Sequence, residues 1–196
     1  MKRIGVNIDH IATLRNTRNE NHPNVYEAAK FAIKCGADSI TIHLREDRRH
    51  INYKDLKEIV KNKKIPLNLE IAANHEMLKI ALKSKPNFVC LVPEKRNEIT
   101  TEGGLNLKKD LKKIKIIINK LNSANIRTSL FINPNINDIK LSKQINTKCI
   151  ELHTGKLSRL VKSKNKYKHQ LNKIIKCAKY AKFLNINVHA GHGMDY

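Results

Sequence analysis

The most constraining feature of this sequence is a repeated alternation of short apolar segments with longer amphipathic ones. Seven segments have the length and composition of β-strands, and six segments between them have apolar residues at helical spacing. The starts of the predicted strands lie roughly 20 to 40 residues apart, which is the size of one βα unit. The sequence therefore predicts an α/β protein. The predicted strands cover residues 4–9, 39–44, 66–71, 88–93, 128–133, 149–155 and 186–193.

Two architectures are common for such an alternation, the eight-stranded barrel and the open doubly wound sheet. The loop after the first strand lacks the GxGxxG pattern of dinucleotide-binding sheets, and no GxxxxGK[ST] pattern occurs anywhere. Polar residues end nearly every predicted strand, which fits the mouth of a barrel better than a single crevice. We therefore predict one domain, residues 1–196, of the (β/α)8 TIM-barrel type, although only seven of the eight strands can be found.

Composition narrows the class of protein further. The chain has 196 residues, of which 40% are hydrophobic and 5% aromatic, so we expect an aliphatic core. No apolar run approaches the roughly 20 residues of a membrane helix, and a strand pattern begins at the N-terminus, so we expect neither a membrane span nor a signal peptide. Four widely spaced cysteines without a CxxC pair favour free thiols in a cytoplasmic protein.

The net charge of +22 would ordinarily suggest a nucleic-acid partner. The lysines, however, lie mostly on the outer faces of helical segments, whereas seven of nine arginines fall in predicted loops after strands. A planar guanidinium binds phosphate or carboxylate through two hydrogen bonds, which lysine cannot do. We therefore expect small anionic substrates, and neither nucleic acid nor membrane as a partner. The seven arginines are Arg15, Arg18, Arg45, Arg48, Arg49, Arg96 and Arg159.

Residues 39–50 show this charge pattern most sharply. An alternating strand, residues 39–44, is followed directly by Arg-Glu-Asp-Arg-Arg-His. One interpretation is an anion-binding site at the end of a parallel strand, and the other is a solvated loop of surface ion pairs. The stretch alone does not decide between these two interpretations.

Imidazole and carboxylate groups end most of the other strands as well, and in a barrel these ends converge on one face. Such groups transfer protons near neutral pH, so the set indicates acid–base catalysis. Each residue alone also has a structural interpretation, such as a cap, an ion pair or a filled core position. The set is Asn7, Asp9, His10, His43, Arg45, Glu70, Glu94, Asn133, Glu151, His153, His189 and His192.

Two further features of the sequence bear on ligand binding. Gly103 and Gly104 lie in a long Thr-rich loop, which is either a mobile lid over a phosphate or an ordinary flexible loop. His189 and His192 are weak candidates for metal ligands, because side chains at odd separation on a strand point to opposite faces. We therefore expect no metal.

The motifs that contain these residues resemble the pyridoxine 5'-phosphate synthase family over the whole chain. The resemblance implies a (β/α)8 barrel that condenses 3-amino-2-oxopropyl phosphate with 1-deoxy-D-xylulose 5-phosphate to pyridoxine 5'-phosphate, phosphate and water. It also implies a cytoplasmic homo-oligomer, typically an octamer, without metal or organic cofactor. The motifs are GVNIDHIATLR at 5–15, IHLREDRRHI at 42–51, NLE at 68–70, LVPEKR at 91–96, TTEGGL at 100–105, IELHTG at 150–155 and AGHG at 190–193.

The resemblance also implies roles for individual residues. His43 matches the family's proton acceptor, Glu70 a second acid–base group, and His192 a proton donor. Glu151 matches a residue that stabilises charge in the transition states. Contacts to the aminoketone phosphate are implied for Asn7, Arg18 and Gly193. Contacts to the deoxyxylulose phosphate are implied for Asp9, His10, Arg45, His50 and Thr100.

The sequence departs from the family at its end. Family members continue past the AGHG motif through a helix, an eighth strand with a Gly-His pair for the aminoketone phosphate, and a last helix. The sequence ends at Tyr196, so we expect these elements to be missing and the chain to be a fragment or a truncated reading frame. An open seven-stranded barrel exposes two strand edges, so we expect the 196 residues alone not to form a stable active enzyme.

Two other functions stay open at this point. The histidines could serve a metal-dependent TIM-barrel hydrolase, although the His-x-His pattern usual on its first strand is absent. The positive charge could serve a basic RNA-binding protein, although aromatic residues are few and no RNA-binding motif occurs.

Overall fold

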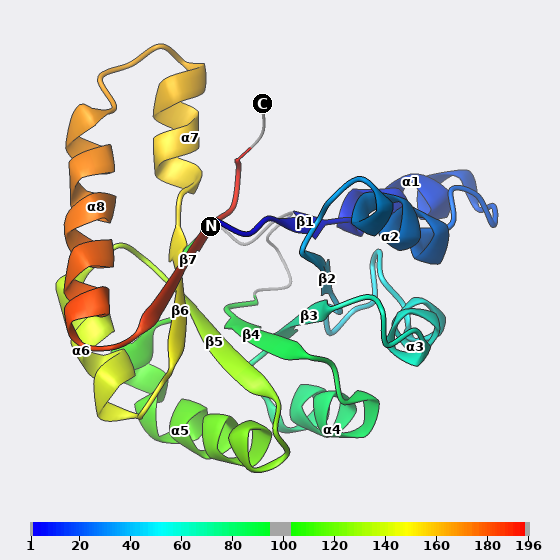
Figure 1. The fold of residues 1–196 in the computed structure, drawn as a ribbon, viewed down its shortest axis with the longest axis horizontal. Coiled ribbons are helices and arrows are strands. Elements are labelled where there is room, and N and C mark those ends of the chain that lie inside the picture. Colours follow the sequence, from blue (N-terminus) through cyan, green and yellow to red (C-terminus); the bar gives the residue numbers. More distant parts are fainter. Residues whose placement is uncertain (1, 95–102, 195–196) are drawn as a thin grey trace. The chain divides into compact units, whose positions relative to one another are not determined.

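A computed structural model describes residues 2–94 and 103–194, and these ranges contain seven strands and eight helices (Figure 1). The strand order in the sheet follows the chain from β1 to β7. At least one helix separates each strand from the next, so the predicted α/β class and βα connectivity are confirmed. The chain divides into two compact units, Met1–Cys90 with Leu121–Arg127, and Leu91–Lys120 with Thr128–Tyr196. That the whole forms one domain stays a prediction.

The first unit contains three strands that pair in parallel, with helices between them. β1 pairs with β2, and β2 pairs with β3 so that His43 lies opposite Glu70. α2 packs on β2 and α3, and α4 packs on β3 and α3. The elements are β1 (Gly5–Asn7), α1 (Asp9–Arg18), α2 (Val25–Lys34), β2 (Ser39–His43), α3 (Tyr53–Lys61), β3 (Leu67–Ala72) and α4 (His75–Ser84).

The second unit repeats this arrangement. β5, β6 and β7 pair in parallel, with Glu151 opposite His189 and His153 opposite Gly191. α8 packs on β7, α6 and α7. The elements are α6 (Ile136–Gln144), β6 (Cys149–His153), α7 (Gly155–Lys162), α8 (Lys168–Phe183) and β7 (Asn187–Gly191), and three elements contribute residues to both units: β4 (Phe88–Val92), α5 (Leu107–Ser123) and β5 (Arg127–Ile132).

The core of each unit is aliphatic, as the composition predicts. In β2 the fully buried side chains of Ile40 and Ile42 alternate with those of Ser39 and Thr41, which are half-buried. Because this alternation places one set of residues against the helices, each strand is fixed in register by burial. The equivalent buried residues elsewhere are Leu67, Leu69, Ile71, Leu130, Ile132, Ile150 and Leu152.

Asparagine starts and ends many of the helices. The Asn side chains at the N-caps of α2, α3, α4 and α6 accept hydrogen bonds from backbone N–H groups of the first turn. Asparagine also occupies four left-handed backbone positions, at 19, 125, 146 and 185. Since the chain has only seven glycines, asparagine supplies much of the turn chemistry that glycine commonly supplies. Gly36, predicted to end the helix before it, has φ +101° as expected.

Two predicted loops proved to be helices. α1 follows β1 and α7 follows β6, where the arginines were predicted to lie in loops. Only Ala12 is buried within α1, so the helix has no apolar stripe that periodicity could detect. Tertiary contacts stabilise it instead, above all those of Arg15. The prediction of loop arginines is therefore wrong for Arg15, Arg18 and Arg159, which lie on these helices, and Arg96 lies outside the described residues.

The contact that joins α1 to α3 is a buried ion pair. The Arg15 Nη1 and Nη2 atoms lie 2.5 Å and 3.0 Å from the two Asp55 carboxylate oxygens, and the side chains are 12% and 6% exposed. Asp55 Oδ2 also accepts the Asn52 backbone N–H at 3.0 Å, which completes the capping box at the start of α3. This carboxylate therefore stabilises two elements at once.

We expect Asp55→Ala to lower the free energy of unfolding by about 3 kcal/mol, because it leaves a buried guanidinium without its partner. Urea unfolding of the purified protein measures the change. The matched control is Glu20→Ala, which removes an ion pair with Arg18 whose side chains are 60% and 49% exposed. This control should change stability by less than about 1 kcal/mol, and equal losses in the two variants would contradict the prediction.

Candidate active site

The first unit brings two predicted acid–base residues together at neighbouring strand ends. His43 is the last residue of β2, and its Nδ1 lies 3.9 Å from Oε2 of Glu70 on β3. Both side chains are largely shielded from solvent, with exposures of 6% and 18%. The distance is longer than a hydrogen bond but within the range of an ion pair if His43 is protonated. The pair can therefore exchange a proton through a reacting group placed beside it.

Asp9 and Asn7 fix the backbone beside this pair. Asp9 Oδ1 accepts the His43 backbone N–H at 2.8 Å. Asn7 Nδ2 donates to Asp9 Oδ2 at 2.9 Å, and Asn7 Oδ1 accepts the Asp9 backbone N–H at 2.9 Å. Asp9 is therefore held from two sides and itself fixes the end of β2. In this structure the two residues position His43, whatever else they contact when a ligand is bound.

The loop after β2 carries Arg45 and His50. Arg45 is 2% exposed, and its Nε lies 3.9 Å from Asp47 Oδ1. The His50 ring lies 6.1 Å from the His43 ring, measured between centroids. The backbone carbonyls of Arg49 and His50 accept hydrogen bonds from α1. Arg15 Nη2 donates to the His50 oxygen, and Asn16 Nδ2 donates to both oxygens. These contacts hold the loop so that the Arg45 guanidinium and the His50 imidazole lie near the His43 imidazole.

The protonation of His50 follows from its contacts. Its Nδ1 lies 2.8 Å from the Ile51 backbone nitrogen and accepts that N–H, so a neutral ring carries its proton on Nε2. Burial lowers the pKa of His50 below its ordinary value of 6.5, although the Asp9 carboxylate partly opposes this. His50 is therefore a neutral donor through Nε2 at neutral pH rather than a cation.

The second unit places Glu151 and His192 on β6 and directly after β7. Glu151 faces Gly191, and a Cβ added to Gly191 would lie 2.3 Å from Glu151 Oε1. His192 has the unusual φ of +80° for a residue other than glycine, and Gly193 follows with φ +73°. The Gly193 carbonyl accepts a hydrogen bond from the Ser158 hydroxyl of α7. The backbone that carries His192 is thus fixed by contacts rather than by its own preference.

Three aromatic rings pack together in this second unit. His153 lies 4.8 Å from His192 and 5.1 Å from Phe131, between ring centroids. The Thr154 hydroxyl lies 2.6 Å and 2.8 Å from the carbonyl oxygens of Gly191 and His192. Sequence reasoning included His153 among the strand ends but gave it no role, and it missed Phe131 and Thr154 altogether. The only sequence signal for Phe131 and Thr154 is that they lie near the ends of two predicted strands.

The ring of His192 is also neutral near pH 7. Burial is the main cause that lowers its pKa from the ordinary 6.5, and the positive charge of Arg159 on α7 adds to the effect. His153 is 5% exposed, and its Nδ1 accepts the Gly155 backbone N–H at 3.1 Å. Gly155 has no room for a side chain, because an added Cβ would lie 2.6 Å from His153 Cε1 and 2.8 Å from His192 Cδ2.

The remaining predicted site residues are less closely integrated. His10 is exposed on α1, and Arg18 at the end of α1 pairs with Glu20 at 3.0 Å. Thr100 lies outside the described residues. Gly104, from the Thr-rich loop, donates its N–H to Asn133 Oδ1 at 3.1 Å, and an added Cβ would lie 2.2 Å from the Asn133 nitrogen. This end of the loop is therefore anchored against β5.

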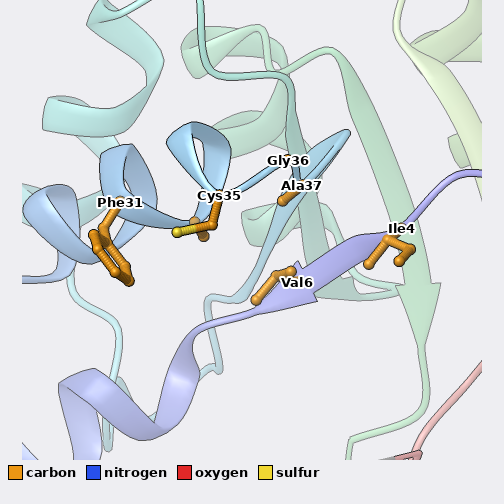
Figure 2. Close-up of a pocket in the computed structure, with 7 residues that line it drawn as sticks. Ile4, Val6, Phe31, Cys35, Gly36 and Ala37 are labelled. Atoms are coloured by element: carbon orange, nitrogen blue, oxygen red, sulfur yellow. The ribbon is translucent and has the colours of Figure 1, made fainter.

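Other parts of the described chain offer less chemistry. Within residues 2–94 and 103–194, no group of three or more His, Cys, Asp or Glu side chains could hold a metal ion. Cys149 Sγ and His189 Nε2 lie 3.6 Å apart as a two-residue contact. The groove shown in Figure 2, with a volume of about 320 Å³, is apolar and lies between β1 and α2. It is lined by Ile4, Val6, Phe31, Ala32, Cys35, Gly36 and Ala37, which are unsuited to bind a phosphate.

No helix in the described part of the chain is long and apolar enough to cross a membrane. The fold resembles solved structures of low sequence identity. D-psicose 3-epimerase from Clostridium cellulolyticum H10 matches 97% of this chain and 73% of its own, with a TM-score of 0.58 and 10% identity. Phosphoribosylanthranilate isomerase from Thermotoga maritima matches 97% and 87%, with a TM-score of 0.51 and 12% identity. These likenesses and the strand order show a fold of the TIM-barrel type, of which the described residues form seven strands with ionisable side chains at their ends.

Residues 4–196 match the family described as "Pyridoxal phosphate biosynthesis protein PdxJ", and the chain belongs to that family. A relative from Pelagibacter ubique, named pyridoxine 5'-phosphate synthase, is 59% identical over all 196 residues and 82% of its own length. Relatives of the same name from Zymomonas mobilis and Ehrlichia canis are 52% and 51% identical over 99% and 98% of this chain, and 75% and 79% of their own lengths. The resemblance seen in the motifs is thereby confirmed, as is an association with vitamin B6 biosynthesis.

The two lowered histidine pKa values predict how stability depends on pH. Below about pH 6.5 the unfolded chain binds protons at His50 and His192 before the folded chain does, so the free energy of unfolding should fall as the pH falls through this window. Urea unfolding at pH 7.5 and 5.5 measures the difference. His50→Asn and His192→Asn should each reduce it, whereas His169→Asn, on the exposed surface of α8, should not. If the stability difference between pH 7.5 and 5.5 is the same in both site variants as in the wild type, His50 and His192 are not its cause.

Proposed function

We propose that this chain condenses 3-amino-2-oxopropyl phosphate with 1-deoxy-D-xylulose 5-phosphate to pyridoxine 5'-phosphate, phosphate and water. The observation that carries the proposal is the placement of His43 and Glu70, 3.9 Å apart at adjacent strand ends, in a chain of the PdxJ family. Imine formation, dehydration and loss of phosphate each require proton transfer, and an imidazole beside a carboxylate supplies both an acceptor and a donor.

The charges of the first unit support phosphate binding. Both proposed substrates carry a phosphate dianion, and Arg45 is a buried guanidinium in the loop that also carries His50. A guanidinium in a shielded position binds phosphate more strongly than one in water, because the local dielectric is lower. The neutral His50 adds an N–H donor through Nε2. We propose that both residues contact the phosphorylated ketose together with Asp9, His10 and Thr100.

His43 is the proposed proton acceptor, and Glu70 exchanges protons with the same intermediates. His192 is the proposed donor. Because its pKa is lowered, the His192 imidazolium is a stronger acid than free imidazolium, and the ring must take up its proton within the reaction cycle before it can donate. Glu151 is the proposed electrostatic partner of cationic transition states. Asn7, Arg18 and Gly193 are proposed to bind the aminoketone phosphate.

The two alternative functions lack support of this kind. A metal-dependent hydrolase needs several ligands around one ion, and the relatives of this chain carry the name of a synthase. An RNA-binding protein needs stacking aromatics along a basic surface, and only 5% of the residues are aromatic. An RNA-binding role would not explain why a carboxylate and an imidazole lie together at the strand ends.

We also propose a cytoplasmic homo-oligomer. None of the four cysteines, which all lie in the described residues, forms a disulfide, as expected in a reducing compartment. Large apolar side chains are exposed on several helices, among them Phe31 at 69% and Phe183 at 79%, and such side chains are often covered in an assembly. Light scattering during size-exclusion chromatography measures the mass, and a monomer at all concentrations would contradict the oligomer.

The direct test of function uses the purified chain and both substrates. Formation of pyridoxine 5'-phosphate would support the proposed reaction and would overturn the expectation that the 196 residues alone are inactive. In the active protein, we expect His43→Ala to lower kcat/KM by about 10²- to 10⁴-fold, the usual contribution of a general base. Circular dichroism should show an unchanged fold. The Pelagibacter ubique relative checks that the assay works, and His169→Ala is the matched control. Wild-type turnover in purified His43→Ala protein would remove His43 from this role.

A second prediction concerns Glu151. Gly191→Ala places a methyl group where the carboxylate lies, so Glu151 must rotate away from its position. We expect turnover to fall at least about tenfold, with little loss of stability, because the clash is with the end of a flexible side chain. Thermal unfolding and turnover are measured on the same protein. If the variant is as active as the wild type, the orientation of Glu151 is not needed.

A further inference from the structure

We infer that Arg48 is a positioning residue, which holds the loop of residues 45–50 in the conformation that presents Arg45 and His50 to a phosphate. Glu46, Asp47, Arg48 and Arg49 are the charged residues of this loop to which the family resemblance assigns no role. The inference rests on the proposed function for what the loop binds, but the conformational role of Arg48 can be tested without any substrate.

Arg48 closes a turn on the residue that it positions. Its backbone N–H donates to the Arg45 carbonyl at 3.1 Å, and its own Nη1 donates to that same oxygen. Arg48 has φ +55°, a left-handed conformation that is uncommon for a residue with a long side chain. A backbone in this conformation persists when surrounding contacts fix it. The carbonyl of Arg45 therefore accepts two hydrogen bonds from Arg48, one from its backbone and one from its side chain.

The other end of the Arg48 side chain is anchored on two helices. Nη2 donates to the Tyr53 hydroxyl at 2.7 Å and to Glu76 Oε1 at 3.0 Å. The guanidinium carbon also lies 4.8 Å from the centre of the Tyr53 ring, which adds a cation–π contact. Tyr53 is the first residue of α3, and Glu76 lies in the first turn of α4. One guanidinium thus connects the loop carbonyl to both helix starts.

Further contacts secure the same loop at other points. Asn74, the N-cap of α4, donates its side-chain N–H to Glu46. Arg15 and Asn16 bind the carbonyls at 49 and 50 from α1, as described above. Among these contacts, those of Arg48 are the ones made to the backbone carbonyl of Arg45, the residue with the buried guanidinium. Removal of the Arg48 side chain should therefore increase the mobility of Arg45 more than that of His50.

Arg49 provides a matched control within the same loop. Its side chain, which is 33% exposed, pairs with Asp47 at 2.6 Å. Arg49→Ala removes the same charge from the adjacent position without touching the Arg45 carbonyl. A general effect of loop charge should appear in both variants, whereas positioning by Arg48 should appear only in its own.

The experiment compares Arg48→Ala, Arg48→Lys and Arg49→Ala in the full chain. We expect Arg48→Ala to raise the KM for 1-deoxy-D-xylulose 5-phosphate by roughly tenfold, because the loop must be ordered again on binding. The KM for the aminoketone phosphate should change by less than about twofold, and kcat should fall less than the KM rises. Arg48→Lys should recover only part of the loss, since an ammonium group cannot reproduce the planar fork.

Hydrogen exchange of the free protein supplies the second readout. Amides of residues 46–51 should exchange faster in Arg48→Ala and remain near wild type in Arg49→Ala. Unchanged exchange and unchanged KM in Arg48→Ala would overturn the inference, as would equal effects in Arg49→Ala. If Arg48→Ala does not fold, Tyr53→Phe combined with Glu76→Gln weakens the same anchor, and wild-type exchange in that protein would overturn it too. If the wild type forms no pyridoxine 5'-phosphate, the proposed function fails, while the exchange data still decide the role of Arg48.

Discussion

Parallel pairing in a fixed register is the constraint on which the candidate site depends. Because His43 lies opposite Glu70, and Glu151 lies opposite His189, ionisable side chains far apart in sequence lie on adjacent strands. Buried isoleucine and leucine residues enforce the register, since a shift by one residue would turn every strand's apolar side chains to the wrong face. The energy that positions the acid–base groups therefore comes mainly from hydrophobic burial, and the groups themselves need contribute little stability.

Contacts to the backbone then define the chemistry of each group. Ile51 and Gly155 donate backbone N–H groups to Nδ1 of His50 and His153, which places the proton of each neutral ring on Nε2. Asp9 accepts the backbone N–H of His43, and Arg48 donates to the carbonyl of Arg45. The candidate catalytic side chains are thus oriented through hydrogen bonds that sequence motifs do not display.

The charged loop after β2 combines both interpretations that its sequence allowed. Arg49 and Asp47 form a half-exposed ion pair of the ordinary surface kind. Arg45 is buried beside His50, as an anion site requires, and Arg48 joins the two functions by spanning from the Arg45 carbonyl to Tyr53 and Glu76. Ion pairs at the surface contribute little stability by themselves, but here one of them anchors a proposed binding residue.

The sequence by itself determined the α/β class, seven strands, the aliphatic core, the family and the residue types at the strand ends, because periodic burial and long motifs are local in the chain. It did not reveal α1 or α7, or the contacts of Phe131, Thr154 and Arg48. α1 lacks an apolar stripe and depends on the Arg15–Asp55 pair between residues 40 positions apart. Only tertiary structure decides such features, because their stabilising partners are distant in sequence and leave no period to detect.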